Sequence, residues 1–302
     1  MIDSLCNLDS SYTLNDFTRQ DKIGSGSFGK VFKVKDKKTD EIFVAKISID
    51  RIEKDSIELL HNLSREVNIL SKLNHPCVLK FIFYSPFDFK KNPKPVIITE
   101  FASNGSLEDL IENNRNSLSA DIDFNLTRKL IIIYGIASAM SYLHSNNIIH
   151  RDLKPANILL DQYLFPKVAD FGLSKISHKS DNSITLNSIG SVKGTPIYMA
   201  PEIWYNAEYS QQSDVYAFAM IVYEIITGLK PFDGFNYFQI PLQIEREYRP
   251  ELGNEIPDSY SNLITDCWSQ DPLKRPSFDQ ILIRLTNDQV FITESVDKSE
   301  FF

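Results

Sequence analysis

Hydrophobic and polar positions change their pattern along the chain. In the first third, short β-branched and aromatic runs alternate with charged residues, as in residues 30–35, where Val31, Phe32 and Val34 interleave with lysines. That alternation predicts strands. Leucines at helical spacing over residues 55–73 predict one helix among them. Beyond the middle of the chain the pattern is mainly helical, and residues 125–146 predict a long buried helix.

The candidate chemistry lies in residues 150–170. A polar loop precedes the apolar run at residues 158–160, and a turn and a second short run lead to Asp170. This order predicts a hairpin with Asp152, Asn157 and Asp170 at its open end. Two carboxylates and an amide oxygen suit Mg²⁺, together with a base that takes a proton from a hydroxyl. The pattern therefore favours a metal-assisted group transfer.

The same residues resemble the eukaryotic protein kinases, whose signature includes H-R-D-L-x-x-x-N and D-F-G. Residues 150–157, HRDLKPAN, and residues 170–172, DFG, match at every signature position. The resemblance implies an α+β, two-lobed protein kinase fold, with a small antiparallel-sheet N-lobe that carries one helix and a larger, mainly helical C-lobe.

The resemblance also implies domain boundaries. We expect an N-terminal tail at 1–16, a protein kinase domain at 17–286 and a C-terminal tail at 287–302. Within the domain, the N-lobe would span 17–102 and the C-lobe 103–286.

The glycine-rich segment at residues 24–31, GSGSFGKV, is compatible with three motifs: a dinucleotide fingerprint, a P-loop and a kinase glycine-rich loop. The first two open a helix, but the alternation after Gly29 predicts a strand. The P-loop also needs a hydroxyl where this chain has Val31. A glycine hairpin between two strands remains.

Lys46 stands inside the β-branched and aromatic run at residues 41–49. By itself such a lysine is usually a solvated strand residue, but it matches the third-strand lysine that holds the α and β phosphates of ATP. The chain departs from the family pattern because Val44 stands two before this lysine and the alanine is Ala45. Glu66 lies within the apolar stripe of the expected helix, where a carboxylate needs a partner, and Lys46 is the expected one.

The resemblance assigns a nucleotide site around ATP. Thr99 would be the gatekeeper beside the adenine, backbone groups of Glu100 and Ala102 would bond it, and Ser106 would reach the ribose. The complete set of implied nucleotide-binding residues is Ile23, Gly24, Ser25, Gly26, Ser27, Phe28, Gly29, Val31, Val44, Lys46, Glu66, Thr99, Glu100, Ala102, Ser106 and Leu159.

The implied catalytic residues are Asp152, which accepts the proton of the acceptor hydroxyl, Lys154, which steadies the transferring group, and Asn157. Asn157 and Asp170 would hold Mg²⁺. The combination of Lys154 and Thr195 at these positions resembles the pattern of serine/threonine kinases. The run at residues 267–278 is most similar to the tyrosine-kinase-like branch.

Residues 174–191, rich in Ser, Thr and Asn, match the family's activation loop, and Ala200-Pro201-Glu202 matches its A-P-E segment. We expect a phosphate on this loop to bond Arg151 and Lys175. The candidate acceptors are Ser183, Thr185, Ser188 and Ser191, of which Ser188 and Ser191 are favoured because they lie near Thr195.

Two further polar residues are expected to be structural. Asp214 precedes an apolar helix and is expected to act in part as a helix N-cap, while the resemblance also implies bonds to backbone amides near the catalytic loop. Glu202 and Arg275 are expected to form a buried ion pair.

Composition limits the expected partners and cellular location of the protein. The formal net charge of −8 argues against a nucleic-acid partner or an anionic membrane. Three scattered cysteines fit a reducing compartment. The N-terminus lacks a secretory signal pattern, and no apolar stretch reaches the length of about 18 residues that a membrane span needs. A soluble, cytoplasmic protein without membrane insertion is expected.

The function implied is an ATP-dependent protein serine/threonine kinase acting on protein hydroxyls in signal transduction. Two alternatives stand beside it: a pseudokinase that binds ATP or scaffolds without turnover, and a small-molecule kinase of related fold. Lys46, Asp152 and Asp170 disfavour the first, and the A-P-E segment disfavours the second. The substrate, the pathway and the oligomeric state do not follow from the sequence.

Overall fold

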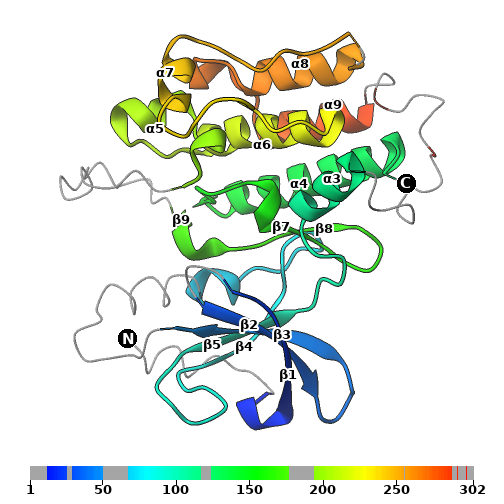
Figure 1. Cartoon of the computed structure of the whole chain (residues 1–302), viewed down its shortest axis with the longest axis vertical. Helices are drawn as coiled ribbons and strands as arrows, with labels where there is room; N and C mark the ends of the chain where they lie inside the picture. Colours follow the sequence, from blue (N-terminus) through cyan, green and yellow to red (C-terminus); the bar gives the residue numbers. More distant parts are fainter. Residues whose placement is uncertain are drawn as a thin grey trace. The chain divides into compact units, whose positions relative to one another are not determined.

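The computed structural model describes residues 12–25, 29–49, 67–116, 124–176, 194–254, 256–287, 291 and 297. The chain divides into two compact units, Met1–Ser103 and Asn104–Phe302. Figure 1 shows strands dominating the first unit and helices dominating the second. The expected combination of an antiparallel sheet and a mainly helical part is confirmed.

The described part of the first unit forms a five-stranded sheet in the order β1-β2-β3-β5-β4, and its paired neighbours are antiparallel. A short 3-10 helix, η1 (Leu14–Asp16), precedes it. The strands are β1 (Phe17–Ser25), β2 (Gly29–Asp36), β3 (Ile42–Ser48), β4 (Phe81–Ser85) and β5 (Val96–Glu100).

The sequence alternation predicts which face of this sheet is buried. Phe43, Ala45 and Ile47 of β3 point to one face because successive strand residues point to opposite sides. They join Phe17 and Val34 in the core of the unit. Tyr12 and Leu14, which the sequence places in the N-terminal tail, also pack against this core, so ordered packing begins before residue 17.

The second unit is built from helices and short hairpins. Its helices are α3 (Leu107–Arg115), α4 (Leu126–Ser145), α5 (Pro201–Asn206), α6 (Gln211–Thr227), α7 (Ile240–Glu245), α8 (Asp258–Cys267) and α9 (Phe278–Asn287). Its short strands are β6 (Ile148–Ile149), β7 (Ile158–Leu160), β8 (Pro166–Val168) and β9 (Lys175–Ile176), and its 3-10 turns are η2 (Pro155–Asn157), η3 (Phe171–Leu173), η5 (Pro196–Tyr198) and η6 (Pro272–Lys274).

Two helices of this unit, α4 and α6, are apolar around most of their circumference, which is typical of helices buried on all sides. Residues 213–225 of α6 are buried without interruption. The long buried helix predicted over residues 125–146 is confirmed as α4. Helix α6 therefore forms the centre of the unit, and polar side chains that it carries must find partners inside the protein.

The end of the chain contributes more than the loose tail that its polar composition suggests. Phe291 is buried, and its ring contacts that of Tyr260 edge to face at 5.0 Å. The backbone N–H of Asp297 donates to Thr127 Oγ1 at 2.9 Å. None of the helices that the structure describes is both long and apolar enough to cross a membrane.

Candidate active site

The predicted hairpin is present as β7 and β8. Ile158 pairs with Val168, and the N–H of Ala169 donates to Asn157 O at 2.9 Å. Asn157 therefore lies just before one strand and Asp170 just after the other, at the same end of the hairpin. The register of the two strands brings these two candidate metal ligands together.

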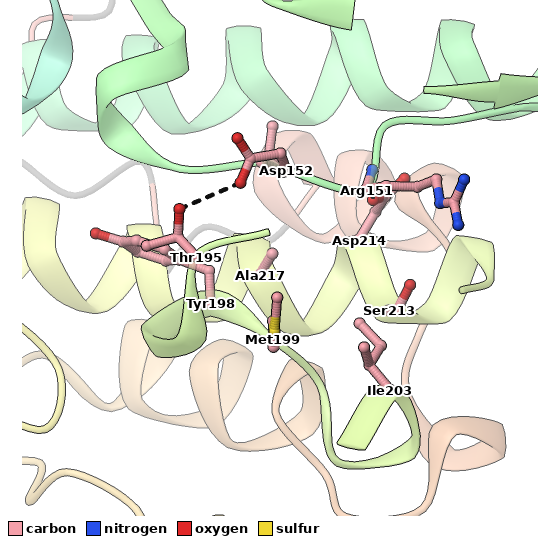
Figure 2. Close-up of a pocket in the computed structure, with 10 residues that line it drawn as sticks. Arg151, Asp152, Thr195, Tyr198, Met199, Ile203, Ser213, Asp214 and Ala217 are labelled. Carbon is pink, nitrogen blue, oxygen red and sulfur yellow. Dashed lines mark hydrogen bonds between the residues drawn. The ribbon is translucent and has the colours of Figure 1, made fainter. Parts of the chain in front are cut away.

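Asp152 lies at the centre of a hydrogen-bonded set. Lys154 Nζ donates to Asp152 Oδ2 at 2.8 Å and to Thr195 Oγ1 at 2.9 Å. Thr195 Oγ1 donates to Asp152 Oδ1 at 3.2 Å, the contact drawn in Figure 2. Asn157 Nδ2 donates to the backbone O of Asp152 at 2.8 Å and to Oδ2 at 3.1 Å. Two of the catalytic residues expected from the sequence, Lys154 and Asn157, thus bond the carboxylate of the third, Asp152, and Thr195 is a further donor.

Asp214 supports the backbone of this loop. Its carboxylate is 2% exposed and accepts from the N–H groups of His150 at 2.9 Å and Arg151 at 3.0 Å. His144 Nε2 lies 2.9 Å from Asp214 Oδ2. The expectation that Asp214 caps a helix is wrong: α6 has Ser210 as its N-cap, and Asp214 lies inside the first turn. The side chain instead bonds the catalytic loop, as the resemblance implies.

Arg151 adopts a left-handed conformation with φ of 72°. For a residue with a long side chain this conformation costs about 1–3 kcal/mol. The two backbone hydrogen bonds to the Asp214 carboxylate offset that cost, since bonds to a charged group each contribute about 1.5–3 kcal/mol. The guanidinium lies over the ring of Tyr209 at 4.1 Å.

The residues around Asp152 and Asp214 are tightly packed. The hollow that they line in Figure 2 has a volume of about 10 Å³, close to the minimum for one water molecule. Gly194 suits its position beside them because its φ is 131°, a backbone conformation that other residues rarely adopt, and a Cβ there would also lie 2.8 Å from Met199 Cε. This hollow is therefore a packed junction and not a ligand pocket.

The first unit brings a second group of expected residues onto one face of its sheet. Val31 pairs directly with Lys46, and Val44 pairs directly with Thr99. Directly paired residues of neighbouring strands point to the same face. The four side chains therefore share the face opposite the aromatic core around Phe43.

The glycine-rich segment joins the same sheet. Ile23, Gly24 and Ser25 end β1, and Gly29 begins β2, while residues 26–28 (Gly26, Ser27 and Phe28) lie outside the described residues. A Cβ on Gly29 would lie 2.2 Å from Ile47 O, so the close approach of β2 to β3 requires glycine there. The predicted strand, glycine segment and strand are confirmed on both sides.

The remaining expected nucleotide residues occupy strand and helix ends. Thr99 is 8% exposed, and Glu100 Oε1 accepts from Lys80 N at 2.8 Å. Ala102 follows β5. Ser106 is the N-cap of α3, exchanging hydrogen bonds with Asp109, and its backbone forms a bridge with Leu159. Ser106 thus has a structural role in addition to the ribose contact that the resemblance implies.

Several expectations fall on parts of the chain outside the described residues. Glu66 lies outside the described residues, and so does its expected pair with Lys46. The four candidate phosphorylation sites of the activation loop also lie outside them. The backbone of Lys175 is described in β9, where it pairs with Ile149. The proposed regulatory contacts therefore remain predictions.

The structure also reveals polar residues that the sequence did not single out. Tyr198 donates its hydroxyl to Glu224 Oε1 at 2.6 Å, and Glu224 is 1% exposed. Burial raises the pKa of Glu224 to about 7. An acidic residue inside the apolar helix pattern of residues 215–226 was the available signal. The expected pair of Arg275 and Glu202 is confirmed, with two contacts of 2.7 and 2.9 Å.

The donors at the end of the hairpin fit Mg²⁺. Asn157 donates to Asp152 through Nδ2, so the Oδ1 atom of Asn157 could serve as a metal ligand, and Asp170 could add a carboxylate. The described residues contain no group of three or more His, Cys, Asp or Glu side chains able to hold a metal. This small donor set suits Mg²⁺, which usually takes its other ligands from phosphates and water.

Comparison with known proteins agrees with this geometry. Residues 17–284 match the model of the protein kinase domain. The chain is 37% identical over 262 residues to a probable serine/threonine-protein kinase of Dictyostelium discoideum, covering 86% of this chain and 26% of that protein. It is 32% identical to the serine/threonine-protein kinase STY17 of Arabidopsis thaliana, covering 86% of this chain and 42% of that protein. It is 31% identical to the dual specificity protein kinase shkC of D. discoideum, covering 92% and 52%.

These relatives are longer proteins, and the chain spans between a quarter and about half of each. The similarity covers most of this chain and includes both the sheet of the first unit and the Asp152 loop of the second. The chain belongs to the protein kinase domain family.

Proposed function

We propose that this chain is a catalytically active protein serine/threonine kinase that transfers the γ-phosphoryl group of ATP to protein hydroxyls. The observation that carries the proposal is the set of contacts around Asp152. Lys154 and Thr195 each hold one of its carboxylate oxygens, and Asn157 contacts its backbone. A base positioned in this way is what transfer to a hydroxyl requires.

The reaction assigns one task to each of these side chains. The acceptor hydroxyl donates its hydrogen bond to the Asp152 carboxylate, which takes the proton as the hydroxyl oxygen bonds to the γ-phosphorus. The bond from that phosphorus to the bridging oxygen of ADP breaks. Lys154, which reaches both Asp152 and Thr195, offsets the negative charge on the transferring group.

ATP and Mg²⁺ are part of this proposal. Asn157 and Asp170 would hold Mg²⁺, which neutralises charge on the phosphates. Lys46, paired with Glu66, would bind the α and β phosphates. The glycine segment, Val31, Val44 and Thr99 would enclose the nucleotide, and their common sheet face supports this assignment.

Regulation by the activation loop belongs to the proposal as well. A phosphate on Ser188 or Ser191 would attract the Arg151 guanidinium, which lies over Tyr209 at 4.1 Å. Lys175 would supply a second cation. Phosphatase treatment should then lower turnover, and Ser188→Ala and Ser191→Ala should identify the site.

Serine/threonine specificity is supported by the contact of Lys154 with Thr195 and by the names of the relatives. We assign the chain to the tyrosine-kinase-like branch on the pattern of residues 267–278. Action inside a cell is proposed because the three cysteines of the chain are few and widely spaced, a pattern that fits a reducing compartment.

The test is to incubate the purified chain with ATP and Mg²⁺ and to locate incorporated phosphate by mass spectrometry. Asp152→Asn should lower turnover by on the order of 10²–10⁴ while ATP binding stays near normal. Asp233→Asn, at an exposed position, is the matched control. Full turnover of the Asp152 variant would show that Asp152 is not the base. ATP binding without any turnover in the unmodified chain would instead favour a scaffold or pseudokinase.

A further inference from the structure

Lys33 of β2 makes a contact to which the proposed reaction assigns no task. Its Nζ atom lies over the ring of Phe101, 4.6 Å from the ring centroid. A cation within about 6 Å of the centroid of an aromatic ring is attracted by the negative potential of the ring face. Phe101 follows β5 directly and stands between Glu100 and Ala102, whose backbone groups the resemblance assigns to adenine. The contact therefore involves the segment that would hold the base of the nucleotide.

The register of the sheet places Lys33 on the face proposed for the nucleotide. Lys33 pairs directly with Val44, and Val44 pairs directly with Thr99. Directly paired residues of neighbouring strands point to the same face. Val31 points there as well, because it lies two positions before Lys33 on the same strand. Lys33 thus shares a face with the side chains that would enclose ATP, and it lies farther from the glycine-rich segment than Val31.

The contact reaches across the sheet. Strand β3 lies between β2 and β5. Neighbouring strands are about 4.8 Å apart, so β2 and β5 are separated by about 10 Å. The side chain of Lys33 must therefore extend past β3 to reach Phe101 at the end of β5. In this way it links two parts of the sheet that are not neighbours.

The surroundings of Lys33 differ from those of the next lysine on the same face, Lys35. Lys35 Nζ pairs with Asp40 at 2.7 Å, and the side chain of Asp40 is 78% exposed. Lys33 and Phe101 are both half-buried. Attraction between a cation and a ring becomes stronger as the cation loses water. Lys33 therefore has an aromatic partner near the nucleotide face, whereas Lys35 has an ordinary surface partner.

We propose that the contact between Lys33 and Phe101 is a clasp that holds β2 against residues 100–102 and slows the release of nucleotide. The proposal rests on the kinase function proposed above. Val31 on β2 and the backbone of residues 100–102 would bound adenine on two sides, so their separation sets the width of the adenine site. Lys33 is a positioning residue, because it acts through Phe101 and not by touching the nucleotide.

The test measures release of the fluorescent analogue mant-ADP, with Mg²⁺ present, by stopped-flow fluorescence. Lys33→Met keeps an unbranched apolar side chain and removes the charge. Its dissociation rate constant should be about 2- to 5-fold larger than that of the unmodified chain, as expected for a partly exposed cation–π contact. Lys33→Arg should keep release slow, because a guanidinium stacks well on an aromatic ring. Equally slow release from Lys33→Met and the unmodified chain would overturn the proposal.

A second substitution tests whether the two side chains act as a unit. Phe101→Leu removes the ring and should also speed release. Because both substitutions break the same contact, the double variant should release mant-ADP about as fast as either single variant. Lys35→Met is the matched control, on the same face of the same strand, and should leave the rate constant unchanged. Increases that multiply in the double variant, or an equal increase in Lys35→Met, would contradict the clasp.

Nucleotide release separates this proposal from the kinase activity, because it needs no phosphoryl transfer. If release depends on Lys33 and Phe101 as expected but no protein substrate is phosphorylated, the clasp stands and the proposed activity fails. If protein substrates are phosphorylated but release is the same in all these variants, the activity stands and the clasp fails.

Discussion

The two ends of α6 each carry a buried carboxylate, and the two are held in different ways. Asp214, in the first turn, meets two backbone N–H groups and His144, all at 2.9–3.0 Å. Glu224, in the last turns, meets the hydroxyl of Tyr198 at 2.6 Å. Both side chains are almost fully buried, at 2% and 1% exposure.

The difference lies in what each carboxylate has in place of water. A buried carboxylate is costly unless hydrogen bonds replace its lost hydration. Asp214 receives donors from the backbone of the catalytic loop, so its charge fixes the position of that loop. Glu224 receives a single side-chain donor, and burial dominates, which raises its pKa to about 7. One end of the helix therefore positions the loop of the proposed catalytic residues, while the other places a titratable group in contact with Tyr198.

The largest expected effect is that of Asp214→Ala. The substitution leaves the N–H groups of His150 and Arg151 without their acceptor, and the left-handed backbone of Arg151 loses its support. Displacing catalytic residues by about 1 Å can cost about 10²-fold in rate, so turnover should fall by at least that order. Steady-state kinetics beside ATP-binding measurements would check it. The turnover of Asp214→Asn, which keeps one acceptor oxygen, should be intermediate. Full turnover of the Ala variant would show that Asp214 does not position the loop.

The next effect concerns Arg275, which bonds α6 through Gln212 O at 2.8 Å and Glu202 through both carboxylate oxygens. Its side chain is fully buried. Arg275→Ala strands the carboxylate of Glu202 and should lower the free energy of unfolding by about 3–5 kcal/mol. Urea denaturation would measure this.

A matched control for Arg275 exists on α9. Arg284 pairs with Asp266 at the same distance, 2.7 Å, but that carboxylate is 53% exposed. Arg284→Ala should therefore cost less than about 1 kcal/mol. Equal losses for the two arginine variants would mean that burial does not distinguish the pairs.

Glu224 should make stability depend on pH. Its folded-state pKa of about 7 lies above its ordinary value of 4.5, so between these values the folded chain binds more protons than the unfolded chain. The free energy of unfolding should then fall as pH rises from 4.5 to 7, by about 3 kcal/mol, and this contribution is complete below pH 4.5. Denaturation at several pH values would show the slope. In Glu224→Gln the free energy of unfolding should depend less on pH in this window. An unchanged pH dependence would show that other groups cause it.

The smallest effect is expected for Tyr198→Phe. The hydroxyl of Tyr198 lowers the pKa of Glu224 by donating to its carboxylate, so its loss should raise that pKa further. The cost should be about 1 kcal/mol at pH 8, where the carboxylate is charged, and smaller at pH 5. Tyr205→Phe, with 53% of the side chain exposed, provides the control. A cost independent of pH would show that Tyr198 acts through packing alone.

The sequence predicted most of the site because the relevant residues are close along the chain. Asp152, Asn157 and Asp170 belong to one loop and one hairpin, and the pairing of Ile158 with Val168 follows from two apolar runs joined by a turn. Likewise the alternation in β2 and β3 determines that Val31 and Lys46 can share a face. Local patterns carry this information because strand and helix periods are local properties.

The wrong prediction for Asp214 and the missed role of Glu224 have a common cause, which is that the partners of both side chains come from other segments of the chain. From the sequence, Asp214 is an acidic residue at the start of an apolar helix, and capping is the usual role of such a residue. Its actual partners, His144 and the His150–Arg151 backbone, come from more than sixty residues earlier in the chain. Phe291, expected in a loose tail, was misjudged for the same reason, because its partner Tyr260 is distant in sequence.

The sequence by itself therefore determined the order of strands and helices, the family and the residues that we propose for phosphoryl transfer, since periodicity and short motifs encode these directly. Only the tertiary structure decided how buried charges are satisfied and how Glu108 meets Lys230. These contacts join segments that are distant in the sequence, and Glu108 and Lys230 are 122 residues apart. Their free energy depends on burial and distance, and neither is defined until the chain has folded.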